Sequence, residues 1–389
     1  MVPKVKGFRK ADMRGIQEIT GIDAACLESG ASCDAAFTSV LREVGDLDAL
    51  APVWSSLASQ TENPMRQYAW VRACAETLAP AGQLRMVVVG SKRQPTAIAP
   101  LLQRRFTGRL ELLGVRELYE PSDAIYSDTS ALDHLADALA RLGQPLFLER
   151  VLADSPLVPA LQRVFQKRGV SFTRPAPESP WIPLHEGWED PESQLSSRRR
   201  SDLRRAIRHA EKIGPIRYEL LSPTPETLPP LVENAFEIEA KSWKGNAGSA
   251  LARDESLGSF YRQVAADACR EGRLRMSFMR IGGRLAAMQM AVECGERYWL
   301  LKMGYDEEYS RCSPGMLLIC ETLRYAATRG LKSYELLGIV ESWTHVWTES
   351  TRPCVSLHFY PMRLGGIADL ATDAAIYAKN WVRGRLKAK

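Results

Sequence analysis

The chain has 389 residues, 45% of them hydrophobic and 25% charged, which is an ordinary globular composition over a length that favours two cores. The formal charge of +5 is too small to indicate nucleic-acid binding by itself, but it is unevenly distributed. Residues 196–214, SSRRRSDLRRAIRHAEKIG, carry +5, and the last eleven residues carry another +5 without an acid. No apolar run approaches the roughly 18 residues of a membrane span. Residues 1–20 lack the apolar core of a signal peptide, and the eight cysteines form no CxxC pair. We therefore expect a cytoplasmic protein with reduced thiols.

The first part of the chain predicts a leader and then a domain. Residues 1–36 are rich in small and charged residues with weak periodicity, and they predict a poorly ordered segment. Three strands of an antiparallel meander follow, at 84–90, 96–105 and 109–114. After them the sequence predicts a helix near 131–142, a strand at 146–152, a helix near 156–168 and a strand at 170–174.

The second half repeats this order. Two helical regions come first, at 193–213 and within 225–271. The three meander strands follow at 274–281, 284–294 and 297–304. A helix at 314–330 and two later strands at 331–338 and 354–360 complete the half. Gly282-Gly283 is a two-residue hairpin signal between the first two of these strands. The repeat predicts an α/β (α+β) fold with a mixed, mainly antiparallel sheet flanked by helices in each half. The proline-rich stretch Pro180–Asp190 resembles a linker between them.

The start of the helix at 314–330 is the most informative local pattern. Ser313 stands at the N-cap, Pro314 at the first helical position and Gly330 at the C-terminal stop. The first turn of a helix has free N–H groups, and Gly315 has no side chain to shield them. Such a start, with Arg311 beside it, suits a phosphate or pyrophosphate, although a capped helix after a loop is also a common structural element. Cys312 adjoins this start, where a thiol pKa can fall, but no partner dyad accompanies it.

The arginine-rich stretch has two interpretations. On a helix, Leu203, Ile207 and Ala210 lie on one face, while Arg204 and Arg208 lie on the opposite face. This pattern favours an amphipathic helix with solvated charges, and contact with a phosphate or another anion is the alternative. No helix-turn-helix, zinc-finger or RNP-type pattern accompanies the arginines, so nucleic acid is disfavoured.

Three stretches in order carry a resemblance: RRRSDLRRAIRHAEKIG (198–214), EIEAKSWKGNAGSAL (237–251) and YDEEYSRCSPGMLL (305–318). With them the chain resembles the CelD-like, or BcsL-like, acetyltransferases, a GNAT branch related to the FemAB peptidyltransferases. RCSPGM stands where the family usually has Q/R-x-x-G-x-G/A. The resemblance implies two tandem GNAT-like domains.

The predicted organisation is a leader at 1–36, an N-terminal GNAT-like domain at 37–186, a C-terminal acyltransferase domain at 187–365 and a basic amphipathic helix at 366–389.

The resemblance also implies a reaction and its residues. An amine or hydroxyl of a cell-envelope or polysaccharide precursor would attack the thioester of an acyl-CoA, or of an acyl carrier protein, directly. Cofactor contacts would come from Arg311, Ser313, Gly315 and Met316. Glu335 and His345 are candidates for the general base, because they lie on and after the strand that follows the cofactor helix. Acceptor contacts would come from Trp243, Lys244, Lys302, Tyr305, Asp306, Arg204 and Arg208. No His, Cys or Asp spacing predicts a metal site.

Three other functions stay open at this stage. The basic C-terminal helix, which contains Trp381, suits contact with a membrane surface, and this favours a long-chain N-acyltransferase acting on a lipid amine, such as a sphingoid base. A FemAB-like ligase that uses aminoacyl-tRNA would place the arginine helix on RNA. A degenerate GNAT pair could serve as a non-catalytic binding module. The expected partner is thus a small-molecule, lipid or glycan acceptor, met in the cytoplasm or at the inner face of the membrane.

Overall fold

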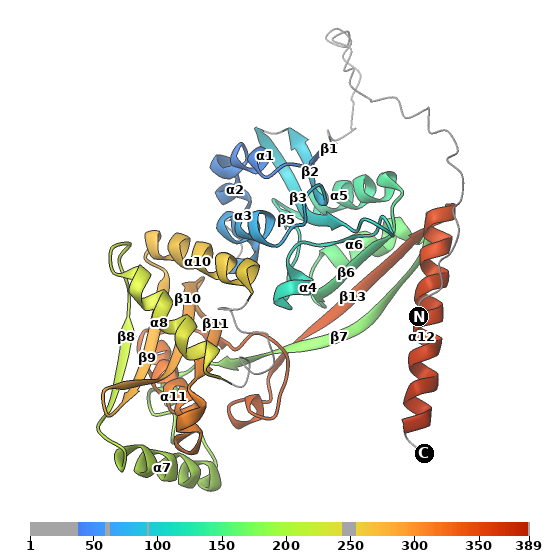
Figure 1. Ribbon diagram of the computed structural model, residues 1–389. Helices are drawn as coiled ribbons and strands as arrows, with labels where there is room; N and C mark the ends of the chain where they lie inside the picture. The colour runs from blue at the N-terminus through green and yellow to red at the C-terminus, as the bar shows by residue number, and fades with distance from the viewer. Residues whose placement is uncertain (1–37, 59–62, 92, 243–253, 388–389) are drawn as a thin grey trace, which may run out of the picture. The chain divides into compact units, whose positions relative to one another are not determined.

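The computed structural model describes residues 38–58, 63–91, 93–242 and 254–387, with side chains to Ala375 (Figure 1). The predicted leader at 1–36 lies outside these residues. The first half contains β1 (Thr38–Leu41), α1 (Gly45–Asp48), α2 (Ala51–Ala58), η1 (Pro64–Arg66), α3 (Tyr68–Thr77), β2 (Leu84–Ser91), β3 (Gln94–Gln103), β4 (Leu110–Leu112), α4 (Val115–Leu118), β5 (Ile125–Tyr126), α5 (Thr129–Leu142), β6 (Leu146–Leu152), α6 (Leu157–Phe165) and β7 (Gly169–Pro183).

The second half contains η2 (Glu186–Glu189), α7 (Ser197–Glu211), β8 (Ile216–Leu221), α8 (Leu228–Ala240), α10 (Glu255–Arg270), β9 (Leu274–Ile281), β10 (Arg284–Cys294), β11 (Arg297–Tyr305), η3 (Glu307–Cys312), α11 (Pro314–Thr328), β12 (Ser333–Glu335), η4 (Thr344–Val346), β13 (Thr351–Pro361) and α12 (Leu364–Lys387). The predicted meander strands, crossover helices and C-terminal helix are all present. Gly282 and Gly283 form the hairpin turn with φ of 58° and 82°, the left-handed values that a two-residue hairpin of this kind requires.

The two halves share one pattern of strand pairing. In the first half, β1, β2, β3 and β4 pair in order as antiparallel neighbours, and β6 lies parallel to β4. In the second half, β8, β9, β10 and β11 pair in the same antiparallel order, and β12 lies parallel to β11. Parallel neighbours need a crossover connection, which includes α5 in the first half and α11 in the second. The repeat predicted from element order is therefore a repeat of topology.

The two halves exchange their last strands. β7 ends the first half and pairs with β12 of the second, whereas β13 ends the second half and pairs with β6 of the first. β7 and β13 also pair with each other, from Gly169 opposite Pro361 to Pro180 opposite Thr351. Figure 1 shows these two long strands side by side, between the two sets of elements. Among the described residues the strands thus form one sheet, in the order β1-β2-β3-β4-β6-β13-β7-β12-β11-β10-β9-β8, with β5 beside β3.

β7 extends into the segment that its prolines indicated as a linker. The strand runs to Pro183, past Pro175, Pro177 and Pro180. β12 pairs only with residues 181–183, so in the described structure the earlier part of β7 has a ladder on its β13 side alone. Proline lacks an N–H and is tolerated on such an open edge. The domain limits expected at 186/187 and 365/366 stay a prediction, and β13 pairs across the first of them.

β12 is much shorter than the strand predicted at 331–338. It contains three residues and stops before Leu337 and Gly338, whose φ values are 58° and 56°. Backbone in this left-handed region cannot continue a strand. The chain therefore turns away from the sheet after Glu335, and the side of β11 beyond Trp299 has no parallel partner in the described structure.

Glu335 on β12 links its own strand to β13, the strand that the second half pairs with the first. Its carboxylate is 2% exposed and accepts hydrogen bonds from Arg352 Nε at 2.7 Å, Arg352 Nη2 at 2.5 Å and Ser333 Oγ at 2.7 Å. Arg297 Nη1 lies 3.7 Å away. Both carboxylate oxygens are thus engaged by side chains from β11, β12 and β13.

α12 is attached to the first half by charge. Arg109 binds Asp369 at 2.9 Å and Asp373 at 2.8 Å, and Tyr360 donates a hydrogen bond to Asp373. Met362, Leu364 and Ile367 at its start are 70%, 89% and 52% exposed. Of the helices in the described ranges, none has the length and apolar character needed to cross a bilayer.

We expect Glu335→Ala to lower the free energy of unfolding by about 3 kcal/mol, because it leaves Arg352 without its buried partner. Glu308→Ala is the control, since the Arg284–Glu308 pair is about 60% exposed on both sides and should contribute less than about 1 kcal/mol. Urea denaturation of both variants measures the difference. Equal losses would show that the buried pair does not hold the exchanged strands.

Candidate functional site

A cavity of about 540 Å³, here called the main cavity, lies where the second half meets a loop of the first. Its wall consists of the end of β11, the start of α11, and two loops that follow α4 and β12. The lining includes Tyr119, Glu120, Ser242, Leu300, Leu301, Lys302, Met303, Gly304, Tyr305, Ser310, Ser313, Gly315, Met316, Leu336, Leu337, Gly338, Ile339, Glu341 and Trp343. The cavity is largely apolar, with a few polar groups that converge on it, as small-molecule sites usually are.

The open edge of β11 forms one wall. β12 pairs only with residues 297–299, so residues 300–305 border the cavity without a parallel neighbour. On the other side, the register between β10 and β11 shifts at Met290, where Lys302 is opposite Met290 and Leu300 is opposite Ala291. Leu301 is the extra residue of this bulge. An open edge and a bulge leave main-chain N–H and C=O groups available to a ligand.

The start of α11 forms the adjacent wall. Ser313 precedes the helix in the left-handed conformation, with φ of 43° and ψ of 50°, and its side chain makes no capping hydrogen bond. A Cβ on Gly315 would lie 3.4 Å from Met303 Cε and 3.5 Å from Tyr305 Cδ1. The absent side chain therefore leaves space between these two residues and the first turn of the helix. This arrangement fits an anionic or extended ligand at the helix N-terminus.

Glu120 is the buried carboxylate of the main cavity. It comes from the loop after α4 in the first half, and it is 9% exposed. The Gly338 N–H donates a hydrogen bond to Glu120 Oε2 at 3.0 Å, although the two residues are 218 positions apart. Arg150, which is fully buried, donates from Nη2 to the Gly338 carbonyl at 2.6 Å and from Nη1 to the Tyr119 carbonyl. Glu120 and Arg150 thus hold both polar groups of Gly338, and we call these three residues the Gly338 clamp.

Strained backbone concentrates around this clamp. Five non-glycine residues in the described structure have positive φ, and four of them, Tyr119, Arg150, Ser313 and Leu337, lie in the clamp or line the main cavity. Such conformations cost of the order of 1–3 kcal/mol each and persist where the surrounding structure enforces them. They turn the chain abruptly at the places where groups from both halves must converge.

Burial sets the charge state of Glu120. Removal from water raises the pKa of this carboxyl to about 7, while the Gly338 N–H and the charges of Arg150 and Lys302 act in the opposite direction. Lys302 stands at the bulge of β11 with its ammonium 4.8 Å from the centre of the Tyr261 ring. A carboxyl with a pKa near neutrality is suited to accept and release a proton.

The structure brings five of the predicted residues together. Lys302, Tyr305, Ser313, Gly315 and Met316 all line the main cavity, and these include three of the four predicted cofactor contacts. They come from two elements, the end of β11 and the start of α11, whose proximity follows from the strand–loop–helix order.

The two residues expected to act as general base lie elsewhere. Glu335 does not line the main cavity, and its oxygens are engaged by Arg352 and Ser333. His345 lies on η4, exposed, with Nδ1 2.9 Å from Glu349 Oε2. In this structure both side chains are committed to neighbours on the protein and not directed at the cavity.

The remaining acceptor candidates are dispersed. Asp306 is buried, and its Oδ1 accepts a hydrogen bond from the Glu308 N–H at the start of η3. Arg204 and Arg208 are exposed on α7, where Arg204 Nε lies 3.6 Å from Glu192. Trp243 and Lys244 fall outside the described residues.

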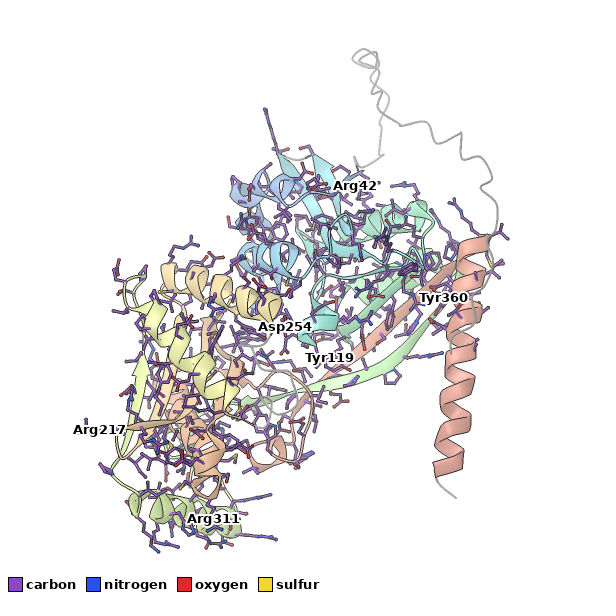
Figure 2. All side chains as sticks on the ribbon, in the orientation of Figure 1. Arg42, Tyr119, Arg217, Asp254, Arg311 and Tyr360 are labelled. Carbon is purple, nitrogen blue, oxygen red and sulfur yellow. The ribbon has the colours of Figure 1, made fainter. Side chains whose placement is uncertain are left out.

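Arg311 lines a second cavity, of about 580 Å³, between α7 and the start of α11. We call it the arginine hollow. Its lining residues are Leu195, Arg199, Asp202, Leu203, Arg205, Ala206, His209, Arg311, Ser313, Met316 and Val346. Figure 2 shows Arg311 beside α7. Ser313 and Met316 line both cavities, so the two adjoin at the first turn of α11. Cys312, which stands between Arg311 and Ser313 in the sequence, is buried. Burial raises the pKa of its thiol, and this does not favour a role as nucleophile.

Sequence reasoning missed Glu120 and Arg150. Both come from the first half, and neither belongs to a motif or a periodic pattern. The only local signal is modest: Arg150 interrupts the apolar strand β6, where a charged residue at a core position needs a partner. That partner is a pair of carbonyl groups from distant loops.

The comparison with known families identifies the second half. Residues 197–344 match the acetyltransferase (GNAT) domain family. The matched region begins at α7 and ends at η4, so it contains the end of β11, the start of α11 and the whole arginine helix. A search of curated protein sequences gave no match.

Solved structures resemble both halves together. The C-terminal domain of a protein named as a lysylphosphatidylglycerol synthetase, from Agrobacterium fabrum, has a TM-score of 0.53 at 11% identity, over 85% of this chain and 96% of that one. L-PGS from Bacillus licheniformis also has a TM-score of 0.53 at 11% identity, over 85% of this chain and 96% of that one. FemX has a TM-score of 0.51 at 12% identity, over 83% of this chain and 97% of FemX. These likenesses concern the fold, and they span both halves of the repeat. Residues 197–344 therefore match a GNAT acetyltransferase domain, and the fold of the chain as a whole resembles that of FemX.

Proposed function

We propose that the protein transfers an acyl group from acyl-CoA to an amine on a cell-envelope or polysaccharide precursor, with Glu120 as the general base. The observation that carries this proposal is the shared cavity. A buried carboxyl whose pKa is near neutrality faces the same space as the open helix start that suits a phosphate-bearing donor. Neither feature alone would indicate acyl transfer, but together they supply a donor site and a proton acceptor.

The residues at the start of α11 fit the donor. Ser313, Gly315 and Met316 would hold its pyrophosphate, because Gly315 leaves room at the first turn and the helix terminus favours an anion. A bound thioester supplies an activated acyl carbon and a thiolate leaving group. The open edge and the bulge of β11 supply main-chain N–H groups for the oxygen of that carbonyl.

The acceptor side of the cavity suits an amine. Trp343, Tyr119 and Tyr305 provide aromatic faces, while Glu120 and Glu341 provide carboxylates. Trp343 Nε1 donates to Glu341 Oε2 at 2.6 Å, which orients the indole at the cavity wall. Aromatic rings with nearby carboxylates attract a cation, and flat apolar faces suit the ring of a sugar. An amino sugar of an envelope or polysaccharide pathway has both properties.

Glu120 would remove the acceptor proton. Its Oε2 is held by the Gly338 N–H, and Arg150 fixes that peptide from the other side, so the carboxylate is oriented before an acceptor arrives. Lys302 stabilises the ionised form of Glu120, so that the carboxyl can release its proton near neutral pH. Positioning of this kind lowers the entropic part of the barrier to attack.

A lipid amine is the second candidate acceptor. Met362, Leu364 and Ile367 are exposed side chains at the start of α12, and the chain continues from there to its basic end. Apolar groups next to basic residues are typical of contact with an anionic membrane surface. A long-chain N-acyltransferase would use the same donor site and the same base.

The test of the proposed function is an acyl-transfer assay. The purified protein is incubated with a series of acyl-CoA thioesters and with amino sugars or sphingoid bases, and released thiol is measured together with the acylated product. Thiol release that depends on one acceptor class supports the proposal and separates the two candidates. Failure to bind or turn over any acyl-CoA contradicts it.

We expect Glu120→Gln to reduce kcat/KM by about 10²–10⁴-fold, because the amide cannot accept the acceptor proton. Glu335→Gln removes a buried carboxylate of the same kind outside the cavity and should reduce kcat/KM by less than about tenfold. Steady-state kinetics with both variants, at matched folded fractions, gives the comparison. A larger loss of kcat/KM in Glu335→Gln than in Glu120→Gln would indicate Glu335 as the base.

The pH dependence should follow Glu120. Wild-type kcat/KM should rise with pH and level off above about 7, as the carboxyl becomes ionised. Because the Lys302 charge lowers the pKa of Glu120, Lys302→Met should move this rise to higher pH. Lys332→Met is the control, since Lys332 is exposed and outside the cavity. An unchanged profile in Lys302→Met would exclude Glu120 as the titrating group.

A further inference from the structure

The arginine hollow has a composition that differs from that of the main cavity. Its basic residues are Arg199, Arg205 and His209 on α7 and Arg311 on η3. A single acid, Asp202, is in the lining, with its Oδ1 3.3 Å from Arg205 Nη2. The hollow is therefore positively charged even with this pair counted.

Three of these basic side chains have no partner on the protein among the described residues. In the described part of the chain, the side chains of Arg199, His209 and Arg311 have no hydrogen bond or ion pair to the protein. Arginines elsewhere in the structure are mostly paired: Arg275 with Glu293 at 2.8 Å and Arg104 with Glu111 at 2.7 Å are examples. Guanidinium groups gathered around a concave surface without acidic partners are typical of phosphate recognition.

The floor of the hollow is apolar. Leu195, Leu203 and Ala206 are buried, and Val346 closes the side formed by η4. A free phosphate or sulfate would use only the charged rim. A ligand that carries both phosphates and a flat apolar group, such as a nucleotide, would use the rim and the floor together.

The hollow continues the main cavity. Ser313 and Met316 line both, and Gly315 between them lines the main cavity. A ligand that has its reactive end at the main cavity and passes the first turn of α11 therefore reaches the hollow without crossing an intervening element.

We propose that the arginine hollow binds the nucleotide end of the donor, with its 3′-phosphate between Arg199, Arg205 and Arg311 and its base on the apolar floor. This assignment rests on the proposed function, because it takes acyl-CoA as the donor. It gives α7 a role in donor binding through the face that packs toward α11. The opposite face of α7, which contains Arg204 and Arg208, does not take part.

The test measures binding and transfer separately. Isothermal titration calorimetry with coenzyme A and with adenosine 3′,5′-bisphosphate is applied to the wild type, to Arg199→Ala, Arg205→Ala and Arg311→Ala, and to the controls Arg198→Ala and Lys212→Ala. The controls are exposed residues of the same helical segment outside the hollow. We expect each hollow variant to weaken both ligands about tenfold or more, as the loss of a charge-assisted hydrogen bond does, and the controls to change them less than about twofold.

Transfer from acetyl-CoA is then compared with transfer from S-acetylpantetheine, which has no nucleotide. The hollow variants should raise KM for acetyl-CoA and leave kcat/KM for S-acetylpantetheine unchanged. If adenosine 3′,5′-bisphosphate binds in the hollow but coenzyme A is not a donor, the site stands and the proposed function fails. If coenzyme A binds equally to the wild type and to all hollow variants, the site is overturned and the proposed function survives.

Two further results would also overturn the site. Equal weakening by Arg204→Ala and Arg208→Ala would show a general effect of charge. Binding of an acceptor-stem RNA hairpin through the hollow, without binding of coenzyme A, would assign the arginines to RNA.

Discussion

The antiparallel pairing of β7 with β13 is the interaction on which the site depends. These strands are the last of their respective halves, and each also pairs with a strand of the other half. The exchange joins the two repeats through the sheet, and α3 of the first half also packs on α10 of the second, where Trp70 and Phe260 are in edge-to-face contact. It brings the loop after α4 against the loop after β12, where Glu120 and Arg150 hold Gly338. The main cavity therefore takes its buried carboxylate from the first half and the walls formed by β11 and α11 from the second.

The Gly338 clamp contributes to the pKa of the buried carboxyl of Glu120. A carboxylate in an apolar cavity is destabilised by the loss of water, and the protein compensates partly, with one peptide N–H and two nearby cations. Around Glu335, by contrast, Arg352 and Ser333 engage the carboxylate in an ion pair and hydrogen bonds. The partial compensation at Glu120 leaves its pKa near neutrality. Both glutamates are buried, but only Glu120 lines the main cavity.

The two halves of the repeat supply different parts of the main cavity. The first half keeps the meander and the parallel strand and supplies Glu120 and Arg150, whereas the second half supplies Gly338, the open edge of β11 and the open start of α11. The match to the acetyltransferase family covers 197–344, so it includes the start of α11 and Gly338 but neither Glu120 nor Arg150. Activity as proposed requires both halves, because Glu120 comes from the first half and the start of α11 from the second.

The sequence by itself indicated the order of the main strands and helices, the repeat, and the strand–loop–helix unit at the end of β11 and the start of α11. Hydrophobic periodicity, Gly282-Gly283 and the Ser313-Pro314-Gly315 start are local signals, and the residues they marked on β11 and α11 do meet in one cavity. Only the tertiary structure decided which strands are exchanged, which glutamate faces the cavity and which face of α7 forms the hollow. These depend on contacts between residues far apart in the chain, and a periodic pattern specifies that a face is buried without specifying its partner.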